Sequence, residues 1–323
     1  MKIPKAYFTG FNSAAKLKKM VTVIYAVILL LALVIAVPFH SALLNQAGNT
    51  MELQPLLKQF NFTVYADFMN SYGKIVKALI PAAIWMGMFY FLFTVFFTGG
   101  ILNILKDENH KFSAVNFFSE CGKYFFRYLR MGIYLLIVQI LIGVIVFLPL
   151  SLIIASNYET TLNEASLFYI SVTGGIIYLL LFILVLIIGD YAKIILYDND
   201  SKKVIKSIYT AFKFTFRHLF GTYLLYILIL AVPVLLFAVY FWLDSALGMV
   251  SGFTIFIMFL IQQVFIWLRV LVKVWFLGSE LTFYGLINVI VKTGHPSRHD
   301  LAVTDAPSLQ INGEEAEENP LPI

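Results

Sequence analysis

Charged residues are scarce in this chain. Only 13% of the 323 residues are charged, while 60% are hydrophobic. A water-soluble domain of that composition would leave apolar surface in contact with water, whereas lipid accepts such surface without penalty. The composition therefore excludes an ordinary soluble protein. The net charge of +5 does not by itself indicate a nucleic-acid ligand, because the position of the basic residues matters more than their sum.

Cysteine and the usual catalytic groupings are also lacking. Cys121 is the single cysteine, so no disulfide can form within the chain. The sequence contains no glycine-rich phosphate loop, no serine or cysteine nucleophile motif, and no histidine spacing that indicates a metal site. We therefore predict a protein that is not an enzyme, needs no metal or cofactor, and binds no nucleic acid.

Long apolar runs dominate what is present. About 20 apolar residues in a helix cross the hydrocarbon core of a bilayer, so runs of 18 or more predict membrane spans. Six such runs occur: Met20–Val37, Ile80–Leu105, Met131–Ala155, Leu167–Ile188, Tyr223–Leu243 and Phe253–Val270. The sequence thus predicts an all-α integral membrane protein with six transmembrane helices, paired in three hairpins.

The basic residues alternate between the connections of these spans. They gather in Lys2–Lys19, Lys106–Arg130, Lys193–Arg217 and Arg269–Lys292, whereas the other three connections hold few of them. Loops rich in Lys and Arg stay on the cytoplasmic side of a membrane. We therefore expect both termini in the cytoplasm and a location in the inner membrane of a bacterium.

Two stretches of the chain match each other at an offset of 90 residues. The phrase "KYFFRYLR" from Lys123 recurs as "KFTFRHLF" from Lys213, each time just before an apolar run. Identities between apolar residues mean little in such a chain, whereas identities between scarce residue types mean more. The scarce identities are Gly99 with Gly189, Asn109 with Asn199, Lys123 with Lys213, and Arg127 with Arg217. We therefore predict an internal repeat of 90 residues.

Polar residues within each copy recur at steps of 4, 3 and 4, the spacing of one face of an α-helix. They are Asn116, Glu120, Lys123 and Arg127 in one copy, and Lys206, Thr210, Lys213 and Arg217 in the other. A fainter third copy begins at Lys5. We predict a six-span domain over 1–292, built of three units at about 1–105, 106–196 and 197–292. Each unit is an interfacial amphipathic helix followed by a hairpin. The acidic tail, 293–323, is predicted to be disordered.

The amphipathic helices have two interpretations. Their cations Lys123, Arg127, Lys213 and Arg217 could bind anionic lipid headgroups while the aromatic residues enter the acyl boundary. Alternatively, each helix only turns the chain through the interface, and its cations follow the positive-inside rule. Repetition at equivalent places favours the second interpretation, because a specific site usually occurs once.

Charged residues at bilayer depth are costly and are therefore functional candidates. Arg269, Lys273 and Glu280 share one face of the last predicted helix, and Asp190 ends the fourth span at a similar depth. An ion pair between Asp190 and Arg269 or Lys273 would join the two helices. The alternative is that these long side chains lie near the cytoplasmic surface and reach water there.

The arrangement resembles a group of bacterial membrane families. The residues that carry the resemblance are "YFFR" and "FTFR" before two spans, and "FY" at Phe283 and Tyr284 after the last span. The group includes the membrane domain attached to some glycerophosphodiester phosphodiesterases. The resemblance implies a non-enzymatic membrane module with a role in envelope or lipid physiology. No catalytic residue carries over, because the chain has no soluble phosphodiesterase domain.

Three hypotheses follow from the sequence. The first is a structural or lipid-associated membrane protein, whose partners are membrane lipids, anionic ones included, and other membrane proteins. The second is a small-solute transporter or channel, with a pathway near Asp190, Arg269 and Lys273. The third is an intramembrane enzyme of lipid metabolism, for which the sequence offers no catalytic group.

Overall fold

The computed structural model describes residues 2–47, 61–107, 112–157, 164–247 and 251–293. Within these ranges the chain is helical and contains no β-strand. The helices are α1 (Lys2–Lys16), α2 (Lys18–Ala47), α4 (Phe62–Lys106), α5 (Ala114–Asn157), α6 (Glu164–Asp198), α7 (Val204–Arg217), α8 (Leu219–Leu247) and α9 (Gly252–Thr293). The described residues up to Phe283 belong to one compact unit, and the last turns of α9, from Tyr284, belong to a second.

The six predicted spans are confirmed as helices that can cross a membrane. Each predicted run lies inside one of α2, α4, α5, α6, α8 and α9, and all six helices are long and apolar enough to span a bilayer. Large apolar side chains such as Ile84, Ile145 and Val234 stay exposed along them. Exposed apolar surface on this scale needs a partner other than water. The chain is therefore a multi-pass integral membrane protein. The acidic tail, 293–323, which the sequence predicts to be disordered, lies outside the described residues from position 294 onward.

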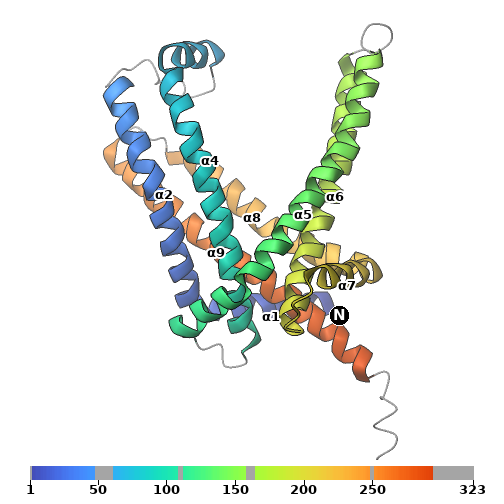
Figure 1. Cartoon of the computed structure of the whole chain (residues 1–323). Coiled ribbons are helices and arrows are strands. Elements are labelled where there is room, and N and C mark those ends of the chain that lie inside the picture. The colour runs from blue at the N-terminus through green and yellow to red at the C-terminus, as the bar shows by residue number, and fades with distance from the viewer. Residues whose placement is uncertain (1, 48–60, 108–111, 158–163, 248–250, 294–323) are drawn as a thin grey trace, which may run out of the picture. The chain divides into compact units, whose positions relative to one another are not determined.

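Neighbouring spans lie side by side in Figure 1: α2 with α4, and α5 with α6. Between α8 and α9 the amide of Gln262 donates a hydrogen bond to the hydroxyl of Tyr240 at 3.0 Å, and Tyr240 also meets Phe265 edge-on. Such polar contacts between spans add a modest stabilisation, about 0.6 kcal/mol on average. The consecutive helices α4 and α5 also contact each other, so these contacts do not by themselves distinguish the three predicted hairpins from other pairings.

Short or polar helical segments, namely α1, α7 and the beginning of α5, precede three of the spans. Each buries one narrow face, at steps of three or four residues. The buried residues are Ala6, Gly10 and Ala14 in α1; Phe117, Cys121, Tyr124 and Tyr128 in α5; and Val204, Ser207, Ala211 and Thr215 in α7. Figure 1 shows α7 lying across the ends of the spans. A helix with one buried stripe and polar residues elsewhere is typical of a surface helix.

Two of these faces meet a span at a glycine, which belongs to the span in one case and to α1 in the other. A Cβ atom at Gly100 of α4 would lie 2.5 Å from the ring of Phe117 and 2.6 Å from the sulfur of Cys121. A Cβ atom at Gly10 of α1 would lie 2.5 Å from the backbone nitrogen of Ser279 in α9. Glycine therefore lets the helices approach closely at both places.

The junction between amphipathic segment and span differs from one place to another. In α5 the helix continues through Arg130 and Met131 without a break. Between α7 and α8 it is interrupted at His218, whose backbone N–H still bonds to the carbonyls of Phe214 and Thr215. The segment before the span is thus a separate helix in α7, and also in α1, which ends at Lys16 before α2 begins at Lys18, but not in α5.

Candidate functional site

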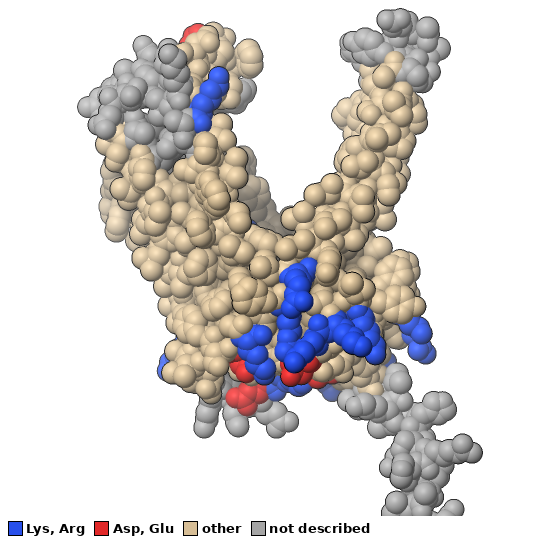
Figure 2. All heavy atoms as spheres, in the orientation of Figure 1, with Lys and Arg blue, Asp and Glu red and all other residues tan. Residues whose placement is uncertain are grey.

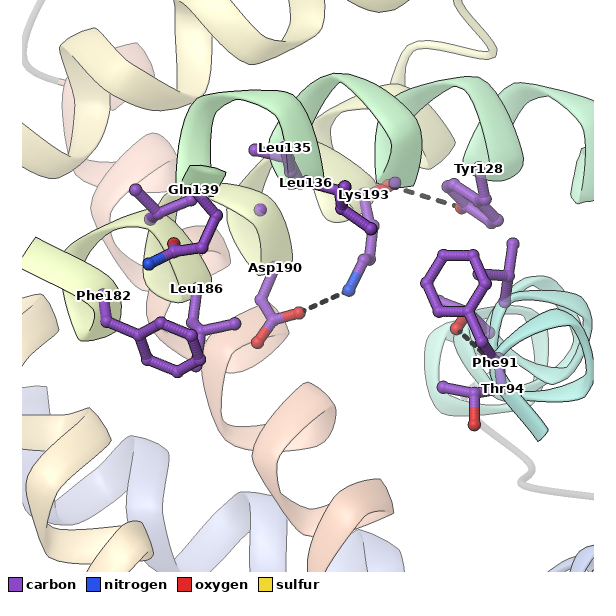
Figure 3. A pocket seen from close by; sticks show the side chains of 15 residues that line it. Phe91, Thr94, Tyr128, Leu135, Leu136, Gln139, Phe182, Leu186, Asp190 and Lys193 are labelled. Carbon is purple, nitrogen blue, oxygen red and sulfur yellow. Dashed lines mark hydrogen bonds and ion pairs between the residues drawn. The ribbon is translucent and has the colours of Figure 1, made fainter. Parts of the chain in front are cut away.

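A cavity of about 250 Å³ lies between α4, α5 and α6 (Figure 3). Most of its wall is apolar, and several wall residues are partly exposed at the outside of the helices. Its lining is Phe91, Thr94, Val95 and Thr98 of α4; Tyr128, Gly132, Leu135, Leu136 and Gln139 of α5; and Phe182, Val185, Leu186, Gly189, Asp190 and Lys193 of α6. A mostly apolar cavity with a few polar groups is the usual form of a small-ligand site.

An ion pair stands at one end of this cavity. The ammonium of Lys193 donates to a carboxylate oxygen of Asp190 at 2.7 Å, and both side chains are about three-quarters buried. Figure 3 shows Lys193 lying between Asp190 and the α4 wall. The hydroxyl of Tyr128 donates to the backbone carbonyl of Lys193 at 3.3 Å, which fixes α6 against α5. Removing either charge would leave the other in a site with little water, at a high cost.

Gln139 is the other polar group of the wall. Its amide nitrogen donates to the hydroxyl of Tyr178 at 3.4 Å. Its amide oxygen is buried and has no hydrogen-bond partner among the residues that the structure describes. A buried acceptor without a partner costs about 1–3 kcal/mol, so a donor from a bound molecule would be stabilising there.

Further charges lie behind the ion pair, on α9. Glu280 is only 2% exposed, and neither of its carboxylate oxygens has a hydrogen-bond partner within the described ranges. Asp190 and Lys193 are within electrostatic range of Glu280, and Lys273 is within range of the same pair. Tyr191, buried next to Asp190 in sequence, is within range of Glu280 as well. Arg269 is within range of Lys273 as well, so each of the four predicted intramembrane residues lies within electrostatic range of at least one other.

The predicted ion pair between helices is replaced by one within α6. Asp190 pairs with Lys193, three residues further on, and in the described part of the chain it forms no ion pair with Arg269 or Lys273. Arg269 is exposed and lines a different cavity, of about 340 Å³, between α8 and α9. A partner one helical turn away needs no relative placement of two helices, which explains why it is preferred here.

Two of the four predicted lipid-binding cations are engaged by other protein groups. Lys123 lies 3.4 Å from Glu120, and its ammonium also sits over the ring of Tyr124 at 5.0 Å. Arg127 lies 2.6 Å from Asp200, and its side chain is largely buried. The Lys123 contacts lie within α5, whereas the Arg127–Asp200 pair joins the beginning of α5 to the turn after α6.

Asp200 is held in place by its contacts with α5. Its φ of 41° is in the left-handed region, which an aspartate tolerates better than most residues. The hydrogen bond from Arg127, with a second from Tyr124 at 3.0 Å, holds the pKa of the Asp200 carboxyl below its usual value. The turn after α6 is therefore stabilised by its contacts with α5.

Lys213 and Arg217, the other two predicted cations, are exposed on α7. They form no ion pair with any residue in the described ranges. The neighbouring His218 has a pKa below its ordinary value, because partial burial and the positive charges of Arg217 and Lys2 disfavour its protonated form. In the view of Figure 2, Lys and Arg side chains gather at the end of the spans where α7 lies, and most of the remaining surface is neutral.

Comparisons with protein-family models, with curated proteins and with solved structures found no match. The geometry of the site therefore carries the functional argument alone.

Sequence reasoning missed several residues of the site. The Asp190–Lys193 spacing of three residues was visible in the sequence, and it is a standard spacing for a helical ion pair. The burial of Tyr128 and Tyr191 was not visible, because aromatic residues occur throughout the chain and only the packing of α4, α5 and α6 distinguishes these two.

Proposed function

We propose that this protein is a non-enzymatic, lipid-associated membrane protein that holds an amphiphilic lipid in the cavity between α4, α5 and α6. The observation that carries the proposal is the asymmetry of that cavity. Its wall is apolar along Phe91, Leu136 and Leu186, and it ends on the Asp190–Lys193 ion pair. A lipid has the same asymmetry, since its chain is apolar and its headgroup accepts or donates charge-assisted hydrogen bonds.

Access from the bilayer supports a lipid rather than a water-soluble ligand. Leu136 of α5 is 50% exposed, and Phe91 of α4 and Leu186 of α6 are also partly exposed. An acyl chain can therefore enter sideways between helices without crossing water. The proposed site lies in the inner membrane of a bacterium with both termini cytoplasmic, as the distribution of Lys and Arg favours.

Native mass spectrometry of gently extracted protein tests the proposal, because it reports bound lipid, partner subunits and oligomeric state together. We expect lipid to be retained by the wild type and by Ile137→Trp, whose side chain is exposed beside the cavity wall without lining it. Leu136→Trp should release the lipid, because its indole would fill the cavity. Equal retention by Leu136→Trp and Ile137→Trp would contradict the proposal.

A small-solute pathway is the second candidate, and the buried charges on α9 favour it. Lys273 and Glu280 lie within electrostatic range of Asp190 and Lys193, so ionisable groups of α6 and α9 lie near one another. Ionisable groups inside a membrane protein are typical of substrate or proton pathways. Proteoliposomes loaded with a pH-sensitive dye would detect proton movement, and we expect Glu280→Gln to abolish it. Proton movement no faster than in empty liposomes would remove this candidate.

A further inference from the structure

Four basic side chains line a separate hollow at the turn between α6 and α7. The hollow has a volume of about 370 Å³, and none of the described residues that line it is acidic. Its lining is Arg130 and Tyr134 of α5, Lys202 and Lys203 of the turn, and Val204, Ile205 and Lys206 of α7. Like charges in one small hollow repel each other, and a bound anion would relieve that repulsion.

The acidic residues nearby in the sequence do not neutralise this hollow. Asp198 pairs with Lys106 at 2.8 Å, and Asp200 pairs with Arg127 at 2.6 Å. The guanidinium of Arg130 makes one hydrogen bond through Nε, to the carbonyl of Phe126 at 3.3 Å, which leaves its terminal nitrogens as donors. The charges that face the hollow are therefore available to a ligand.

An apolar stripe on α7 begins at the same place. Ile205, Tyr209, Phe212 and Phe216 recur at steps of 4, 3 and 4, and are between 46% and 68% exposed. This stripe is distinct from the buried face of α7, which contains Ser207 and Ala211. Ile205 belongs to both the stripe and the lining of the hollow. An exposed apolar stripe flanked by cations is the pattern of a helix in the headgroup layer.

We propose that this hollow binds the phosphate of an anionic phospholipid, with the acyl chains lying along the exposed stripe of α7. Arg130, Lys203 and Lys206 supply charge-assisted hydrogen bonds to the phosphate oxygens. The first-turn backbone N–H groups of α7, which begins at Val204, add to the positive potential. This inference rests on the proposed association with lipid, and it adds a second site with a defined headgroup chemistry.

Binding of dioctanoyl phosphatidylglycerol to the purified full chain in mild detergent tests the inference. We expect Lys203→Gln/Lys206→Gln to weaken binding about tenfold or more, since each basic residue near an anionic surface contributes appreciably. Lys213→Gln/Arg217→Gln removes the same charge from the same helix, outside the hollow, and should weaken binding less than twofold. The charge-preserving Lys203→Arg/Lys206→Arg should bind as the wild type does.

Two further binding measurements test the choice of headgroup and whether free phosphate can replace the lipid. Dioctanoyl phosphatidylcholine should bind at least tenfold more weakly than phosphatidylglycerol, and inorganic phosphate at equal concentration should not displace the bound lipid. Equal losses in the two Gln double variants would overturn the inference, because binding would then follow net charge alone. Displacement by inorganic phosphate would overturn the lipid part. If the hollow binds no phosphatidylglycerol while the wild type still retains a lipid that Leu136→Trp releases, only the second site is refuted. If lipid is bound neither in the hollow nor in the cavity between α4, α5 and α6, the proposed function is refuted as well.

Discussion

The α4–α5 and α6–α7 pairs solve the same packing problem with different residues. Gly100 of α4 lies under Phe117 and Cys121, and the residue 90 positions later, in α6, is Asp190. Asn103 corresponds in the same way to Lys193. The two residues that form the ion pair of the cavity thus occupy positions that are small or uncharged in the first pair.

The comparison distinguishes the residues that helix packing needs from those that packing does not explain. Close contact between the amphipathic segment and the preceding span is made in both pairs: Phe117 lies against Phe97 in the first, and Phe214 against Tyr191 in the second. A charge pair was not needed to build the first contact, so its presence in the second needs another explanation. Binding a polar headgroup at this depth is the explanation that the proposed function offers.

The α1–α9 contact extends the comparison to both ends of the chain. Gly10 of α1 meets Ser279, and Tyr7 lies edge-on to Trp275 at 4.8 Å, with the indole N–H donating to the Tyr7 carbonyl. In the first pair, Phe118 and Phe96 make a corresponding ring contact at 6.4 Å. Thus α1 packs against α9 through a glycine, as the beginning of α5 packs against α4.

The largest expected effect is that of Gly100→Leu, which would break the first pair. The added side chain would overlap the Phe117 ring and the Cys121 sulfur, and overpacking of this kind costs about 3 kcal/mol. Thermal unfolding in detergent, followed by size-exclusion chromatography, should show a marked loss of folded protein. Gly87→Leu, on the same helix, is the control, because a Cβ atom at position 87 meets nothing within 4 Å. Equal stability of the two variants would refute the close contact.

Gly10→Leu should have the next largest effect and tests the α1–α9 contact. The obstacle is the backbone of Ser279, which cannot rotate away. We expect a loss of about 2 kcal/mol, limited because α1 is terminal and can detach from α9. Hydrogen exchange should show faster exchange in α1 and in the facing turns of α9. Thr9→Leu, at an exposed neighbouring position, should leave the exchange rates unchanged. Unchanged rates in Gly10→Leu would refute the close contact between α1 and α9.

A third experiment replaces the two ion-pair residues of α6 with the residues found 90 positions earlier in α4. Asp190→Gly alone should destabilise the protein by about 1–3 kcal/mol, because the Lys193 ammonium loses its carboxylate partner. Adding Lys193→Asn reproduces the Gly100 and Asn103 of the first pair and should recover much of that loss. Thermal unfolding measures the recovery, and native mass spectrometry should show that the double variant retains no lipid in the cavity. Retention of lipid by a stable double variant would separate the ion pair from lipid binding.

The spans could be predicted from the sequence because they depend on local composition. Every predicted apolar run is inside an observed helix. The junctions could not be predicted: "FFRYLRM" and "FTFRHLF" look alike, yet the helix continues through the first and is interrupted at His218 in the second. Whether a helix breaks there depends on packing against other helices. The same holds for Arg127, whose partner Asp200 becomes visible only when α5 meets the turn after α6, whereas the Glu120–Lys123 pair has the i,i+3 spacing that a sequence already shows.

The smallest expected effect concerns Asp200, which joins the two pairs through Arg127. Because the folded protein holds the pKa of Asp200 below its usual value of about 3.9, the ionised carboxylate stabilises the fold above that pH. The stabilisation is lost as the pH falls through the lowered pKa. Asp200→Asn keeps a residue that tolerates positive φ and removes only the charge. Its melting temperature should be slightly lower than that of the wild type at pH 7, and the difference should begin to shrink below about pH 4 and disappear once the pH has fallen through the lowered pKa. A difference that persists at low pH would assign the effect to the backbone turn instead of the Arg127–Asp200 pair.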